Sequence, residues 1–139
     1  MQRKIIIDTG VYIDLFNRGL NRDIINPFQH VTYLAYPVLH ELWMGLSGRQ
    51  EIRQLTAWRD RFIQLQRLIV PTVATIVLIG EACLQLKAAG MLDPKHPKHY
   101  NDITISATAR QIGATVITKN TKDFQIIQSV IDFDFEGLR

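Results

Sequence analysis

The sequence predicts an α/β fold, a three-layer sandwich whose central sheet holds four or five mainly parallel strands. Short β-branched runs alternate with longer helical segments along the chain, as in βαβ units. The runs at residues 5–7 and 114–118 are almost continuously apolar, which is typical of strands covered on both faces. The chain has 139 residues, of which 47% are hydrophobic and 21% charged, and this suits a globular protein with one core. We therefore expect a single domain over residues 1–139.

The individual elements follow from local patterns. Strands are predicted in the segments RKIIID, HVTYLAY, ATVIT and IDFDFE, the last at an edge of the sheet. Helices are predicted over residues 10–19, 37–48, 50–68, 72–89 and 101–113, and a short one within KNTKDFQII. Pro37 at a helix start and Gly90 and Gly113 at helix ends are favoured at those positions. The segment DPKHPKHY is expected to be a loop, because Pro94 and Pro97 interrupt regular structure.

Composition and the apolar segments indicate where the protein works. The most apolar stretch, IVPTVATIVLIGEACLQL, contains Pro71, Gly80 and Glu81, so it predicts a buried helix and no membrane span. At the start of the chain, MQRKIIIDTG, the apolar run is too short for the apolar region of a secretory signal. A single cysteine, Cys83, fits a reducing compartment, so we expect a cytoplasmic protein. The net charge of +3 permits a polyanionic partner without requiring one.

The triplet Asp8-Thr9-Gly10 after the isoleucine run permits several interpretations. Retropepsin-like aspartic proteases carry Asp-Thr-Gly around a catalytic acid, but their fold is nearly all β, whereas this chain is rich in predicted helix. Phosphoaspartyl enzymes also place an acid after the first strand, but they need a pair of acids there. A further interpretation is that Asp8 only caps the following helix. In a parallel sheet, functional sites lie at the carboxyl ends of strands, where Asp8 is expected.

Three further acids are placed to reach the same end of the sheet. Glu41 lies at the edge of the apolar arc of the predicted helix 37–48, and Asp102 lies on the sheet-facing side of the helix 101–113. Asp123 follows the predicted strand ATVIT after a turn. Taken singly, these acids also fit an exposed glutamate, a helix-dipole charge and a turn residue. Taken together with Asp8, they predict a shared acidic cleft.

A cleft that gathers four carboxylates has a chemical consequence. Like charges in a partly buried site repel one another, and they remain ionised only when cations lie among them. Hard oxygen ligands in this number suit Mg²⁺ or Mn²⁺, which keep several waters and bridge to substrate phosphates. His40, beside Glu41, points away from the apolar arc and is expected at the surface. The sequence therefore predicts a magnesium or manganese site that needs no histidine.

The chain resembles PIN-domain ribonucleases, and among them the VapC-type toxins of toxin–antitoxin pairs. The resemblance rests on three segments in the expected order, IIIDTGVYIDLF, PVLHELWMGL and NDITISATARQIGATVITKNTKDF, and it spans nearly the whole chain. The last segment is the most specific, because it joins a helix acid, a strand, TKN and a final DF in one unit. The resemblance implies a PIN-like fold and a metal-dependent endoribonuclease that hydrolyses RNA phosphodiester bonds.

The resemblance also implies roles for individual residues. The family's metal-binding and catalytic acids fall on Asp8, Glu41, Asp102 and Asp123. Thr9 stands where the family often has a small hydroxyl residue that supports the site. Thr118 and Asn120 match the polar residues before the last acid. Asp14 matches a second aspartate of the first helix, which we interpret as structural, and Lys119 stands where arginine is common.

The expected partners are RNA, an antitoxin protein and a second copy of the chain. The predicted helices 50–68 and 72–89 carry more apolar surface than one sheet face covers, which predicts a homodimer, as the resemblance also implies. Lys95 and Lys98, together with His96 and His99, precede Asp102 and are candidate contacts to RNA phosphates, although an ordinary solvated loop is the alternative. A non-catalytic PIN fold that only binds RNA or protein is the alternative to an enzyme, and the complete set of acids argues against it.

Overall fold

The structure is a computed structural model that describes residues 2–25 and 30–138. Within these residues, five strands form one sheet with the order β3-β2-β1-β4-β5. They are β1 (Arg3–Ile7), β2 (His30–Ala35), β3 (Leu68–Ile69), β4 (Thr115–Thr118) and β5 (Asp134–Gly137). Every neighbouring pair is parallel, and β5 lies at one edge, which confirms the predicted sheet.

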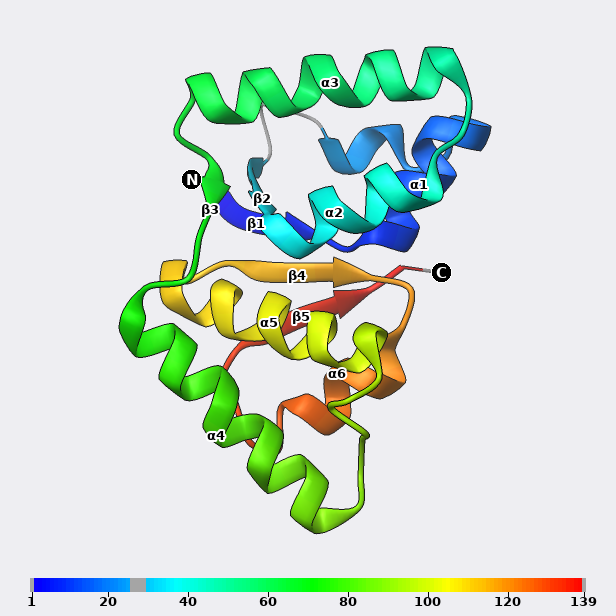
Figure 1. The fold of residues 1–139 in the computed structure, drawn as a ribbon. Coiled ribbons are helices and arrows are strands. Elements are labelled where there is room, and N and C mark those ends of the chain that lie inside the picture. Colours follow the sequence, from blue (N-terminus) through cyan, green and yellow to red (C-terminus); the bar gives the residue numbers. More distant parts are fainter. Residues whose placement is uncertain (1, 26–29, 139) are drawn as a thin grey trace.

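Helices cover both faces of the sheet. They are α1 (Thr9–Arg18), α2 (Tyr36–Gly45), α3 (Arg49–Gln64), α4 (Val73–Ala89), α5 (Pro97–Ile112) and α6 (Thr121–Ile127), with a 3₁₀ helix η1 (Arg22–Ile25). The helices α1 and α3 lie on one side of the sheet and α4, α5 and α6 on the other (Figure 1). The helix α2 packs against both α1 and α5. The three-layer sandwich predicted from the sequence is therefore confirmed.

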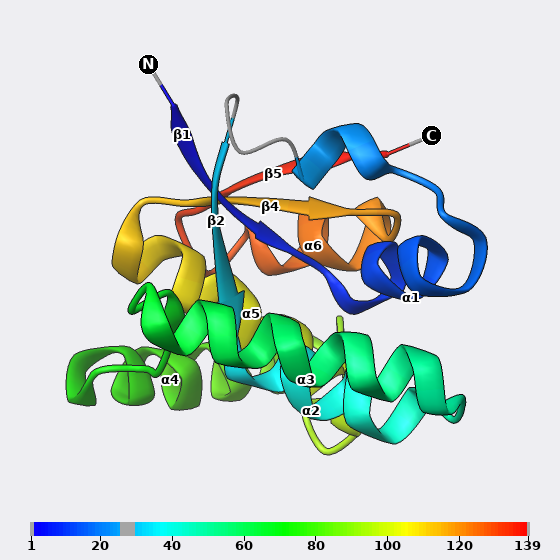
Figure 2. The same cartoon turned by 90° about the horizontal axis from the view of Figure 1, so that it is seen from above.

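The two central strands bring their carboxyl ends to one edge. Ile5–Ile7 of β1 and Val116–Thr118 of β4 are almost fully inaccessible, as predicted for strands covered on both faces. Ile6 pairs with Val116 in the parallel register. Both strands run toward α1 (Figure 2). The residues that follow these two strands are therefore neighbours in space.

The helix α5 begins earlier than the sequence suggested. The predictions of a loop through residue 100 and of Asn101 as the cap were wrong, because the helix starts at Pro97. Proline suits the first helical position, where its missing N–H has no partner to lose. The cap is His96, whose Nδ1 accepts a hydrogen bond from the backbone N–H of Lys98 (3.3 Å). The earlier start places Lys98 and Asp102 one helical turn apart.

The helix α4 buries only one side, so the prediction of a buried helix was half wrong. Its inward side chains are Thr75, Ile79, Ala82 and Leu86. Its outward apolar side chains are Val73, Ile76, Val77 and Leu84, each more than half exposed. No helix among residues 2–25 and 30–138 is long and apolar enough to cross a membrane. The elements β3 and η1 were not predicted, because two to four residues are too few to show a period.

Candidate active site at the carboxyl edge of the sheet

Asp8 lies at the junction of β1 and α1 and is only 5% exposed. Its backbone N–H donates to the carbonyl of Ile117 (2.8 Å), which extends the pairing of β1 with β4. Its Oδ1 accepts from the N–H of Thr9 (2.8 Å), and its Oδ2 accepts from the hydroxyl of Thr118 (2.7 Å). Asp8 is thus the N-cap of α1, and the same contacts fix its carboxylate at the sheet edge.

Glu41 approaches Asp8 through Thr9. The hydroxyl of Thr9 donates to Oε1 of Glu41 (3.0 Å), so one threonine contacts both acids. Burial raises the pKa of Glu41, and the negative charge of Asp8 raises it further. Hydrogen bonds from Thr9 and Asn101 and the positive charge of Lys98 lower this pKa but do not cancel the shift. The two carboxylates therefore lie close enough to repel each other.

Asp123 is connected to Asp8 on the other side. Thr118, which donates to Asp8, accepts from the backbone N–H of Asn120 (2.9 Å). The amide Nδ2 of Asn120 donates to Oδ2 of Asp123 (2.9 Å) on the first turn of α6. His99 lies on the same carboxylate, with Nε2 3.9 Å from Oδ2 of Asp123. One hydrogen-bonded chain therefore joins three of the acids.

Asp102 completes the group from α5 and is only 1% exposed. Its Oδ2 is buried and has no hydrogen-bond partner among the residues that the structure describes. The ammonium of Lys98, one turn earlier, lies 3.6 Å from this oxygen, which is longer than a hydrogen bond. A buried carboxylate oxygen without a hydrogen-bond donor destabilises the folded protein, so a cation bound at this atom would be stabilising.

The surroundings of Asp102 change its protonation. Burial, as the main cause, raises its pKa to about 8. The neighbouring acids Asp8, Glu41 and Asp123 also raise this pKa, whereas Lys98 lowers it. The carboxyl of Asp102 therefore keeps its proton to a higher pH than an exposed aspartate does, and the four carboxylates share one electrostatic environment.

The four carboxylates are of the ligand type that binds a divalent cation, although their oxygens do not converge on one position. Within residues 2–25 and 30–138, no three Asp, Glu, His or Cys side chains stand in a group that could hold an ion as placed. Hard oxygen donors are the ligands that Mg²⁺ and Mn²⁺ prefer. The unpaired Oδ2 of Asp102 is the atom that such a cation would satisfy.

The sequence matches the profile of the PIN domain over residues 5–128. The chain belongs to the PIN-domain family. Solved structures with a similar fold include VapBC2 from Rickettsia felis bound to a DNA fragment from their promoter, with a TM-score of 0.69 and 21% identity over 98% of this chain and 99% of that one. VapBC-1 from nontypeable Haemophilus influenzae has a TM-score of 0.67 and 20% identity, and the match covers 96% of this chain and 97% of that one. These likenesses show a shared fold.

A third similar structure is VapBC-5 from Mycobacterium tuberculosis, described as a member of the VapBC family of toxin–antitoxin systems. Its TM-score is 0.61 at 16% identity, covering 97% of this chain and 98% of that one. No curated protein matches the sequence significantly. The family membership thus rests on the sequence match, and the structures support the architecture.

Two residues lie beside the acids of this PIN domain in positions that the sequence did not predict. Asn101, expected only as a helix cap, hydrogen-bonds Glu41, and His99, expected in an exposed loop, lies near Asp123. A helix start at Pro97 would have predicted both positions, because it places residues 98–102 on the first turns of α5. His40, by contrast, is exposed as predicted.

An ion pair supports the end of β4 in the PIN domain. Lys119, in the turn after β4, pairs with Asp14 of α1. The pair ties the turn that carries Asn120 to the helix that Asp8 caps. A structural role for Asp14 agrees with this contact. Lys95, in the loop before α5, is exposed.

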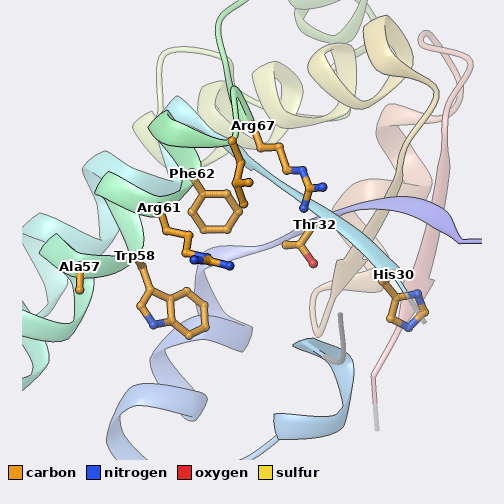
Figure 3. A pocket seen from close by; sticks show the side chains of 8 residues that line it. His30, Thr32, Ala57, Trp58, Arg61, Phe62 and Arg67 are labelled. Atoms are coloured by element: carbon orange, nitrogen blue, oxygen red, sulfur yellow. The ribbon is translucent and has the colours of Figure 1, made fainter. Parts of the chain in front are cut away.

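A cavity of about 400 Å³ lies apart from the acids of the PIN domain, between β2 and α3 (Figure 3). Trp58 and Phe62 of α3, and Leu65 directly after this helix, form the apolar part of the wall. Arg61 and Arg67 also line it, and none of the four acids does. Two guanidinium groups beside aromatic rings suit an acidic and apolar ligand better than a metal ion.

Proposed function

We propose that this protein is a metal-dependent endoribonuclease that hydrolyses RNA phosphodiester bonds and acts as the toxin of a toxin–antitoxin pair. One observation carries the proposal: a hydrogen-bonded chain joins three acids beside the unpaired, buried oxygen of Asp102. The members of this chain are Glu41, Thr9, Asp8, Thr118, Asn120 and Asp123. Membership of the PIN-domain family supports the same function.

In this proposal, Asp8, Glu41, Asp102 and Asp123 hold Mg²⁺ or Mn²⁺. A bound divalent cation lowers the pKa of a water and offsets negative charge on the leaving oxygen. Asp8 contributes a carboxylate whose two oxygens are already oriented by Thr9 and Thr118. Glu41 has a raised pKa, which makes its carboxylate a suitable acceptor for the proton of the attacking water.

The test is an RNA cleavage assay with Asp8→Asn and with metal removal. Asparagine keeps the shape of Asp8 and removes its charge, so cleavage should fall by more than about 100-fold, beyond the usual loss for a residue that only orients a ligand. EDTA should stop cleavage by the unmutated protein, and added Mg²⁺ or Mn²⁺ should restore it. Asp132→Asn, an exposed acid before β5, is the matched control and should leave cleavage unchanged.

The assay separates the proposal from its alternatives. Equal cleavage with EDTA, or by a folded Asp8→Asn protein, would contradict the metal mechanism. RNA binding without cleavage of any tested RNA pool, with metal present, would favour a PIN fold that only binds RNA. Circular dichroism and thermal unfolding of each variant exclude loss of folding as the cause.

We also infer a homodimer, from the outer face of α4. Apolar residues of α4 are arranged symmetrically about Gly80: the exposed Ile76 and Leu84 lie four residues to either side, and the exposed Val77 and the partly buried Cys83 lie three. An antiparallel pair of α4 helices centred on Gly80 would set Ile76 of one copy against Leu84 of the other, as a two-fold interface requires. A Cβ added at Gly80 would meet no atom within 4 Å, so this centre is open to a partner helix.

Light scattering tests the dimer. Leu84→Glu places a charge in the proposed interface and should give a monomer, whereas Gln85→Glu, exposed on another side of α4, should not. Gly80→Leu adds bulk at the crossing, where a Cβ meets no atom of its own copy within 4 Å, so it should weaken association as well. A monomer at high concentration for the unmutated protein would contradict the inference.

An antitoxin protein is the proposed partner. VapBC-5, which shares the fold, is described as a toxin–antitoxin system. The cavity between β2 and α3 suits a peptide that carries an apolar side chain beside a carboxylate, because Arg61 and Arg67 complement the charge. If an adjacent gene encodes a small DNA-binding protein, the two products should copurify. Arg61→Glu with Arg67→Glu should weaken that complex more than Arg49→Glu at the other end of α3, and an equal effect would place the contact elsewhere.

A further inference from the structure

Among the described residues, Lys98 is the cation that lies within ion-pair distance of the buried acid Asp102. It is the second residue of α5, and its Nζ lies 3.6 Å from Oδ2 of Asp102. The two side chains differ in access to water: that of Asp102 is 2% exposed and that of Lys98 is 50% exposed. The ammonium of Lys98 therefore lies beside the buried carboxylate, while half of the lysine side chain remains exposed to solvent.

All four acids act on this one ammonium group. Burial alone would lower the pKa of Lys98, but the surrounding negative charges outweigh burial and raise it. The contributing groups, in decreasing order, are Asp102, Asp8, Glu41 and Asp123. Lys98 thus interacts with the whole acid cluster, and its charge compensates part of the mutual repulsion.

Other basic side chains near the site have different partners. Lys119 pairs with Asp14, and His99 lies by Asp123 at 3.9 Å. Lys95 is exposed and forms no ion pair with any residue in the described parts of the chain. Among the described lysines, Lys98 therefore places its ammonium at the position that a cation bound to Asp102 would occupy.

We propose that Lys98 is an internal counter-ion that neutralises the acid cluster in the metal-free protein and is displaced from Asp102 when a divalent cation binds. The displacement half of this inference rests on the proposed function, whereas the counter-ion half does not. A divalent cation bound at Asp102 would repel the nearby ammonium, and the repulsion strengthens where the two charges are shielded from solvent. The ammonium can leave because its stem is flexible and half exposed, and it then stays beside the site, free to meet an RNA phosphate.

The counter-ion half is tested without metal, by thermal unfolding in EDTA. Lys98→Met keeps the stem and removes the charge, and it should lower Tm by about 3–6 °C, the shift expected for loss of one partly buried partner. Lys98→Arg should restore most of this loss, and Lys95→Met is the control for losing a positive charge nearby. In an Asp102→Asn background, Lys98→Met should cost clearly less. Equal losses in both backgrounds would overturn the counter-ion role.

The displacement half is tested by titrating Mn²⁺ into each variant by calorimetry. Lys98→Met should bind Mn²⁺ about tenfold more tightly than the unmutated protein, because the competing charge is gone. Lys98→Arg and Lys95→Met should bind as the unmutated protein does. Unchanged or weaker binding by Lys98→Met would overturn the displacement.

The two measurements keep this inference separate from the proposed function. If no variant binds Mn²⁺, the metal mechanism fails and the displacement fails with it, while the unfolding experiment still decides the counter-ion role. If Mn²⁺ binds equally to all variants, the metal mechanism stands and only the displacement fails. Neither readout depends on RNA cleavage.

Discussion

Asp8 and Asp102 are both nearly inaccessible, at 5% and 1% exposure, but their carboxylate oxygens differ in hydrogen bonding. Both oxygens of Asp8 accept hydrogen bonds, one from a backbone N–H and one from Thr118. Oδ2 of Asp102 accepts none from the described residues. The pKa of Asp102 is raised to about 8, mainly by burial.

The difference follows from where each acid stands. Asp8 sits at a strand-to-helix junction, where the first N–H groups of α1 have no helical acceptor and are free to bind a carboxylate. Asp102 lies within α5, where the backbone N–H groups are already used by the helix. The strand-end half of the site therefore keeps its shape without metal, and the helix half depends on a cation.

Thr118→Val should reduce RNA cleavage by about 10–100-fold, the usual cost of losing a group that orients a metal ligand. The change removes the donor to Asp8 and the acceptor for the N–H of Asn120. Thr118→Ser keeps the hydroxyl and should retain most of the activity. Full activity of a folded Thr118→Val protein would mean that Asp8 needs no fixed orientation.

Asp102→Asn should stabilise the metal-free protein by about 1–3 kcal/mol at pH 8.5, because a buried charge without a hydrogen-bond donor is removed. The raised pKa also sets a pH dependence, since the folded protein keeps a proton on Asp102 that the unfolded chain loses above pH 4. This contribution to stability is complete below about pH 4, falls as pH rises toward 8, and is constant above that. Denaturant unfolding in EDTA across this range measures it. The asparagine variant should lose that fall, whereas Asp8→Asn should retain it.

Mn²⁺ affinity of the unmutated protein should increase as pH rises from 6.5 to 8, by up to about tenfold per pH unit, because the metal must displace the proton of Asp102. The groups that face this carboxyl are Asp8, Glu41, Asp123 and Lys98. Calorimetry in buffers of different ionisation enthalpy counts the released protons. An affinity that is flat over this range would show that Asp102 is already ionised or does not bind the metal.

Lys95→Ala should have the smallest effect, because this lysine is exposed and lies outside the acid cluster. If it contacts an RNA phosphate, the slope of log Kd against log salt should fall by about 1, with a several-fold loss of affinity. Filter binding with the non-cleaving Asp8→Asn protein measures the slope. An unchanged slope would identify the segment before α5 as an ordinary solvated loop.

Most of the fold was predictable because its elements are long or chemically distinct. The isoleucines of β1 and the run ATVIT predicted buried parallel strands, and the glycines after α4 and α5 predicted where those helices end. The short strand β3 was not predictable, because two residues show no period. The start of α5 was misjudged because Pro97 was interpreted as a helix breaker, although proline also suits a first helical position.

The sequence by itself determined that Asp8, Glu41, Asp102 and Asp123 belong to one edge of a parallel sheet, because strand ends and helix faces follow from local periodicity. It also determined that α4 is apolar, but not that half of this helix faces outward, since a helix apolar on all sides does not specify which side packs. Only the tertiary structure decided which acids receive hydrogen bonds. Thr118 donates a hydrogen bond to Asp8, which lies 110 positions away in the sequence. Oδ2 of Asp102 has the ammonium of Lys98 at 3.6 Å, beyond hydrogen-bonding distance. Such contacts depend on how β1, β4 and α5 pack together, and a local pattern does not contain that information.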